Sequence, residues 1–244
     1  MLTIEQKKIR PSFSNSFGHG WDTLSKYFLI LLLLVILLGI LDVPLGFANF
    51  NFNQHQNEWD GNFQEWFQPF FALFGVMAIV FGIIALAYGL LVQPVFEYGG
   101  DLMFVHAVRD QRPDFESLIK GFKENYLHII LANVLKSALV MMGILFFIIP
   151  GIIVACRLAF VSYLVMDKKR DPIVAIEESW KLTKGYGWTI FLMGFVSIFI
   201  FIIGFVMLIV GMIPAIMWIK SSFASLYENI LIEKNGNGEE AEIV

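Results

Sequence analysis

The sequence predicts an all-α integral membrane protein with six transmembrane helices. They are expected to form three hairpins, each preceded by a short amphipathic helix at the membrane interface. Three observations lead to this fold class: long apolar stretches without charge, basic residues confined to alternate loops, and one sequence pattern that occurs three times. Of the 244 residues, 57% are hydrophobic and 16% are charged, whereas soluble domains carry about 25% charged residues. The mean hydropathy is +0.70, so lipid is the expected surrounding of most of the chain.

The apolar stretches set the number of spans, because one crossing needs about 20 apolar residues. The stretch from Gly185 to Ile219 has 35 residues without a charge, too long for one helix across a hydrocarbon core of about 30 Å. We expect it to turn at Gly211 and Pro214, and the preceding apolar region to turn at Pro150. The predicted spans are residues 24–43, 69–94, 126–149, 151–167, 188–211 and 214–232. They make one domain over residues 1–233, followed by an acidic tail over 234–244 that is expected to be disordered.

The placement of lysine and arginine predicts the orientation in the membrane. Basic residues gather in the N-terminal segment and in the segments after the second and fourth spans, whereas residues 43–68 contain none. Loops rich in lysine and arginine stay in the cytoplasm, so both termini are predicted to be cytoplasmic. The first 26 residues lack the apolar core and cleavage site of a signal peptide.

Each basic segment carries the same pattern. A proline stands where a helix can begin, at Pro11, Pro113 and Pro172. Apolar residues then recur at helical spacing, and a glycine–aromatic pair follows at residues 20–21, 121–122 and 185–186. The pattern predicts a short amphipathic helix in the cytoplasmic interface that leads into a transmembrane hairpin, three times over. The alternative is chance similarity among aromatic-rich membrane segments.

Three cations lie inside predicted spans: Lys136, Arg157 and Lys220. A charge deep in a bilayer costs about 2.5–3.5 kcal/mol on insertion scales, so it is usually paired, hydrated or functional. In one interpretation the three cations converge and bind an anionic group such as a lipid phosphate. In the other they reach the interface, or bond to backbone carbonyls and nearby polar side chains such as Glu228. Lys220 is six residues past Pro214, which places it near the outer face if the helix begins there.

Two carboxylates, Asp42 and Glu228, lie at or within predicted spans. A transporter coupled to protons or ions usually needs a carboxylate at that depth. The competing interpretation is that both are solvated at helix ends.

No set of residues in the sequence amounts to a catalytic centre. The single cysteine, Cys156, excludes an internal disulfide and a cysteine-based metal cluster. The four histidines lack metal-ligand spacing, and the nucleophile elbow, phosphate loop and dinucleotide fingerprint are all absent. We therefore expect no enzyme, no cofactor and no metal, and the net charge of −4 gives no reason to expect a nucleic-acid partner.

Residues 149–158 (IPGIIVACRL) and 175–185 (AIEESWKLTKG) carry a resemblance to a known family. The chain resembles the membrane domain associated with some bacterial glycerophosphoryl diester phosphodiesterases, and is similar to uncharacterised bacterial six-helix membrane proteins. The resemblance is most specific over about residues 145–190. It implies a helical bundle in the bacterial cytoplasmic membrane. It does not imply phosphodiesterase activity, which belongs to a separate barrel of roughly 250 residues.

The leading hypothesis for function is a non-enzymatic envelope or accessory protein that interacts with membrane lipids, with another membrane protein or with a second copy of itself. The alternative is a small transporter or exporter, in which a cavity near Lys136, Arg157 and Lys220 accepts an anionic amphiphile. An intramembrane enzyme is disfavoured because the sequence offers no combination of nucleophile, base and metal ligands.

Overall fold

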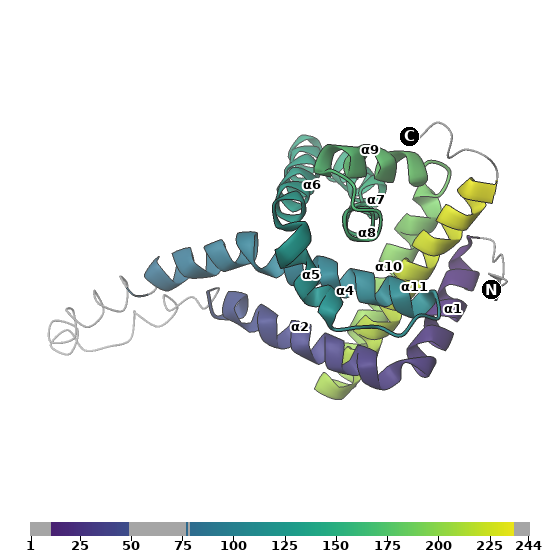
Figure 1. Ribbon diagram of the computed structural model, residues 1–244, viewed down its shortest axis with the longest axis horizontal. Coiled ribbons are helices and arrows are strands. Elements are labelled where there is room, and N and C mark those ends of the chain that lie inside the picture. Colours follow the sequence, from purple (N-terminus) through teal and green to yellow (C-terminus); the bar gives the residue numbers. More distant parts are fainter. Residues whose placement is uncertain (1–10, 49–76, 78, 237–244) are drawn as a thin grey trace, which may run out of the picture.

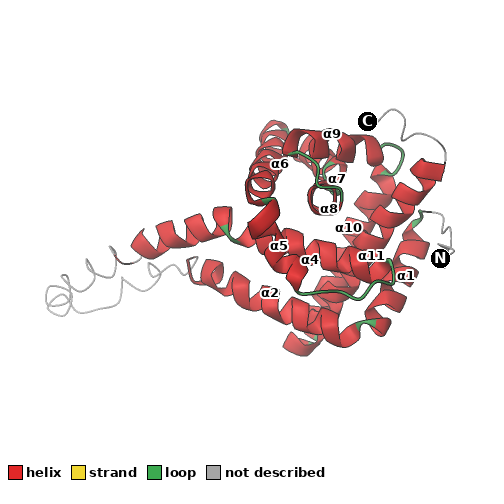
Figure 2. Ribbon diagram, viewed as in Figure 1, coloured by secondary structure: helices red, strands yellow, loops and turns green. Residues whose placement is uncertain are grey.

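The computed structural model describes residues 11–48, 77 and 79–236, without side chains for 42–48 and 208–210. Every regular element in these ranges is a helix (Figures 1 and 2). Four helical stretches are long and apolar enough to cross a membrane: Ile79–Val108, Tyr126–Phe146, Ile148–Asp167 and Gly187–Val206. A fifth arises if the bent pair at the N-terminus forms one span. The all-helical class is thus confirmed for the described residues, and several helices have the length and apolarity that a membrane span needs.

The described helices range from 7 residues in α8 to 29 residues in α11. Residues 79–91 are also helical and lead into α4. The labelled helices, in chain order, are α1 (Phe13–Lys26), α2 (Phe28–Ala48), α4 (Gln93–Val108), α5 (Glu116–Glu124), α6 (Tyr126–Phe146), α7 (Ile148–Arg157), α8 (Val161–Asp167), α9 (Pro172–Leu182), α10 (Gly187–Val206) and α11 (Leu208–Gly236).

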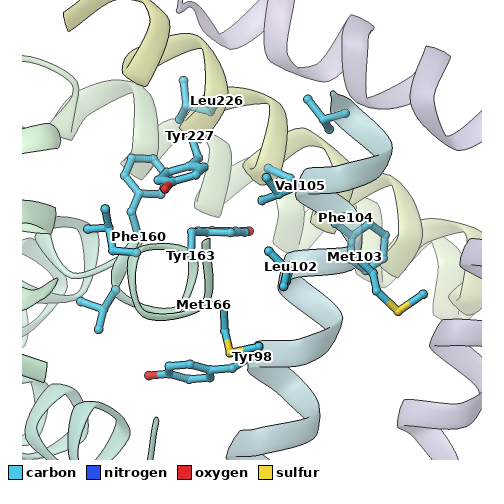
Figure 3. Packing of buried hydrophobic residues seen from close by; sticks show 14 of the residues in the cluster. Tyr98, Leu102, Met103, Phe104, Val105, Phe160, Tyr163, Met166, Leu226 and Tyr227 are labelled. Atoms are coloured by element: carbon cyan, nitrogen blue, oxygen red, sulfur yellow. The ribbon is translucent and has the colours of Figure 1, made fainter. Parts of the chain in front are cut away.

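Three inner helices, α4, α8 and α11, form the centre of the molecule. They pack against one another around large buried side chains, among them Tyr98, Phe160 and Tyr227 (Figure 3). The rings of Tyr163 on α8 and Tyr227 on α11 stack with their centroids 5.0 Å apart. By contrast, α2, α6 and α10 expose many large apolar side chains. This inside-out distribution suits helices whose outer faces contact lipid, because hydrocarbon does not penalise apolar surface.

The three short helices α1, α5 and α9 occur where the prolines predicted them. Each packs on an inner helix: α1 on α11, α5 on α4 and α9 on α8. Two glycines permit the close approach. A Cβ on Gly20 would lie 2.8 Å from the backbone of Ser222 in α11. One on Gly99 of α4 would lie 2.7 Å from the Cα of Leu118 in α5. The contact surfaces of these helices are therefore made by backbone as much as by side chains.

The loops that precede α5 and α9 share one backbone feature. After α4 the chain passes through Asp110 at φ 58°, and after α8 it passes through Lys169 at φ 52°. Each residue stands three positions before a proline, Pro113 or Pro172. Left-handed residues of this kind commonly end helices, so the two loops stop the preceding helix in the same way.

The two tight hairpin turns lie a few residues before the predicted positions. The α6–α7 break is at Phe147, and Pro150 belongs to the first turn of α7, where its missing N–H costs nothing. The α10–α11 break is at Met207, and Pro214 lies inside α11. Close glycine contacts set both positions. A Cβ on Gly143 would lie 2.9 Å from the Cα of Gly151, and one on Gly204 would lie 2.8 Å from the carbonyl oxygen of residue 211.

Two further boundaries differ from the sequence prediction. The second span was expected to end at 94, but helix continues to Val108 and α4 is largely buried. The tail was expected to begin at 234, but α11 continues to Gly236. Residues 69–76 and 78 of the predicted second span, and the rest of the tail, lie outside the described residues. Helix persists through 95–108 because its apolar side chains are packed by the other inner helices, which a window along the sequence does not detect.

Candidate functional site

The first polar cluster joins the three inner helices through Asp101. Its carboxylate accepts hydrogen bonds from Lys220 Nζ of α11 at 2.7 Å and from Ser162 Oγ of α8 at 2.7 Å. Glu97, one turn earlier on α4, has a carboxylate oxygen 4.0 Å from the same Nζ. A buried charge is stable only when it is paired and hydrogen-bonded, so the half-buried Lys220 supplies the partner that the buried Asp101 needs. The carboxylates around Lys220 outnumber the cation.

Arg109, directly after α4, holds the second cluster together. Its Nη1 and Nη2 donate to the two oxygens of Asp167 at 2.5 and 2.8 Å, and its Nε donates to Glu228 at 2.8 Å. Tyr227 donates its hydroxyl to Asp167 at 3.1 Å. The two carboxylate side chains are only 8% and 11% exposed. Burial acts to lower the pKa of Arg109, but the hydrogen bonds and charges of the two carboxylates outweigh burial and raise the pKa above its ordinary value.

A groove opens beside the first cluster, between α2, α4 and α11. Its volume is about 250 Å³, and apolar side chains such as Val35, Phe96 and Ile216 make most of its wall. Glu97 and Lys220 supply polar lining. Typical pockets for drug-sized ligands measure about 300–1,000 Å³. The groove therefore suits a single acyl-chain segment better than a larger metabolite.

The chain matches no protein-family model, no curated protein and no solved structure. The resemblance to the membrane domain of the phosphodiesterases therefore stays a prediction. What can be said about function comes from the charges and cavities of the chain itself.

The three intramembrane cations have three different surroundings. Lys220 lies twelve residues into α11 rather than near its start, because α11 begins at Leu208, and this depth explains its need for Asp101. Arg157 ends α7, where its guanidinium lies 5.9 Å from the ring of Trp180. Lys136 is half-buried on α6. Of the three, Lys220 alone lines the groove, so the structure does not gather them at that cavity.

The two candidate carboxylates, Asp42 and Glu228, lie in different parts of the structure. Glu228 is 8% exposed and pairs with Arg109, so it is not at a solvated helix end. Asp42 belongs to α2, but its side chain lies outside those that the structure describes.

Sequence reasoning missed Asp101, Arg109 and Asp167 as members of the buried clusters. The sequence prediction left Arg109 in the basic segment after the second span and put Asp167 at the end of the fourth span. Asp101 lies within an otherwise apolar run, Gly99 to Val105, and that isolated acid was the one signal in the sequence. A lone carboxylate inside such a run calls for a cationic partner.

A break in the helix beside Arg157 is stabilised by α9. Between α7 and α8 the backbone leaves helical geometry, and Ser179 satisfies both sides of the gap. Its hydroxyl donates to the carbonyl of Arg157 at 2.8 Å and accepts from the Phe160 amide at 3.3 Å. Thr183 Oγ1 donates to the carbonyl of Ser179 at 2.8 Å and lies 3.3 Å from the carbonyl of Arg157. Non-helical backbone is tolerated at membrane depth only when it is satisfied in this way, so α9 fixes the position of Arg157.

Proposed function

We propose that this chain is a non-enzymatic, multi-pass membrane protein that holds one membrane lipid by an acyl chain in the groove between α2, α4 and α11. The observation that carries the proposal is an apolar cavity of about 250 Å³ whose one cation, Lys220, is already paired with Asp101. Lipid is the occupant because α2, which forms one wall of the groove, exposes large apolar side chains such as Leu33 and Ile40.

The charges at the groove favour a head group without net negative charge. Asp101 lies 2.7 Å from the ammonium group of Lys220, and Glu97 adds a second carboxylate at 4.0 Å. An anionic head group would meet an excess of negative charge there. The groove therefore favours a zwitterionic or uncharged lipid, and the anionic-amphiphile transporter becomes the weaker hypothesis.

The topology that goes with this function is six crossings with both termini in the cytoplasm of a bacterium. α11 has 29 residues, about 43 Å at helical rise, which is enough for a sixth crossing. Similar chain reversals at Phe147 and Met207, and the matching loops at Asp110 and Lys169, support three related hairpins. Labelling with a membrane-impermeant thiol reagent tests the orientation, using single cysteines at Gln56 or Lys168 in a Cys156→Ser chain. Reaction at the Gln56 position alone in intact cells is expected, whereas equal reaction would refute it.

The lipid proposal is tested by filling the groove. Gly39 lines it, and a Cβ there would meet no atom within 4 Å, so a side chain added at Gly39 starts in open space and Gly39→Phe is expected to fill the cavity. Native mass spectrometry of the protein, released from phosphatidylethanolamine nanodiscs, should show one retained lipid fewer than wild type. Gly194→Phe is the control, because Gly194 on α10 is equally free of neighbours and does not line the groove. Equal retention in all three proteins would refute the proposal.

A further inference from the structure

Arg157 has a buried guanidinium nitrogen without a partner. Its Nη1 is shielded from solvent and forms no hydrogen bond with any described residue. Among the described residues, the ring of Trp180 faces this charge, with its centroid 5.9 Å from the guanidinium carbon. Among the described arginines, Arg109 and Arg170 both bind carboxylates. A buried donor left unpaired is costly, and more so when it is charged.

Residues of α9 and α10 border this guanidinium. Gly187, the first residue of α10, lies beside it, and a Cβ there would lie 3.9 Å from the guanidinium carbon. The neighbouring apolar side chains are exposed: Ile153, one turn earlier on α7, is 52% exposed and Trp188 is 71% exposed. An oxyanion here would therefore be attached to a molecule that tolerates an apolar setting.

We infer that Arg157, framed by Trp180 and Gly187, binds the phosphate of a membrane phospholipid. The guanidinium fork matches two phosphate oxygens, which is the geometry that arginine binds most strongly. The helix that carries Trp180 is predicted to lie in the cytoplasmic interface, where aromatic side chains meet head groups. The site is separate from the groove and shares with the proposed function only the placement of the chain in a membrane.

The test compares phosphatidylglycerol, diacylglycerol and inorganic phosphate as probes of the purified full chain in detergent. Native mass spectrometry should show binding of phosphatidylglycerol, and neither diacylglycerol nor inorganic phosphate should compete with it. Arg157→Gln should weaken binding at least about tenfold, as expected for loss of charge-assisted hydrogen bonds. Arg157→Lys should bind the lipid with an affinity between those of wild type and Arg157→Gln, because an ammonium group keeps the charge but lacks the guanidinium fork. Arg112→Gln is the matched control, since Arg112 is exposed on a loop.

A second variant keeps the inference falsifiable if loss of Arg157 impairs folding. Gly187→Asp places a carboxylate beside the guanidinium and at the N-terminus of α10, where a negative charge stabilises the helix. It should fold and lose the lipid, whereas Gly187→Asn should keep it. Unchanged binding in both Arg157→Gln and Gly187→Asp would overturn the inference, as would displacement of the lipid by inorganic phosphate. Gly39→Phe should leave phosphatidylglycerol binding at Arg157 intact. This variant therefore distinguishes a failure of the Arg157 inference from a failure of the proposal that the groove holds an acyl chain.

Discussion

Replacing Arg109 by methionine removes the cation that holds Asp167 and Glu228 in the core. Both carboxylates are about nine-tenths buried, and Arg109 itself is 19% exposed. Truncating one partner of a buried ion pair typically costs about 3–5 kcal/mol, because the other charge stays buried without compensation. Whole domains are stable by only about 5–15 kcal/mol. Arg109→Met should therefore remove a large fraction of the free energy of unfolding.

The assay is reversible unfolding in mixed micelles with a rising fraction of dodecyl sulfate, followed by far-ultraviolet circular dichroism. Arg112→Met is the control, because it removes an exposed arginine nearby. Arg109→Lys should show an intermediate loss, since an ammonium group keeps the charge but lacks the planar fork that binds both oxygens of Asp167. Each charge-assisted hydrogen bond contributes about 1.5–3 kcal/mol.

A neutral version of the cluster tests the cause of the loss. Asp167→Asn and Glu228→Gln, added to Arg109→Met, remove the uncompensated charges and should restore much of the stability. The reasoning is refuted if Arg109→Met unfolds at the same detergent fraction as Arg112→Met. It is also refuted if the neutral triple variant is less stable than the single one.

Three further predictions use other contacts of the fold. Gly20→Ala should lower the free energy of unfolding by about 1–3 kcal/mol, because the added methyl group overpacks the contact with α11. Gly18→Ala is the control and should leave the stability unchanged, since a Cβ at Gly18 meets no atom within 4 Å. Unfolding in mixed micelles compares the two variants. Ser179→Ala should cost about 1–3 kcal/mol by leaving the helix break unsatisfied, and faster amide exchange at that break, measured by mass spectrometry, would show it. The hydrogen bond from Lys169 lowers the pKa of Glu124, so this pair stabilises the fold above the ordinary glutamate pKa and the contribution is lost as pH falls. A carbon-13 titration of the Glu124 carboxyl in Lys169→Gln should show the pKa rise, and an unchanged midpoint would refute the pairing.

Local features of the sequence determined the helices and the apolar surface. Pro11, Pro113 and Pro172 marked the short helices because proline fits the start of a helix and interrupts the one before it. The uncharged stretches marked the long helices because helix satisfies every backbone group without water. Both properties depend on residues close together in the chain, so they can be predicted from the sequence alone.

Tertiary packing alone decided which charges meet. Lys220 and Asp101 are 119 residues apart, as are Arg109 and Glu228, and nothing in the spacing pairs them. The turns at Phe147 and Met207 likewise depend on where neighbouring helices can touch through glycine. A single glycine or carboxylate looks the same in any helix until the facing helix is known. The clusters, the groove and the unpartnered Arg157 could therefore be recognised only once the helices were placed beside one another.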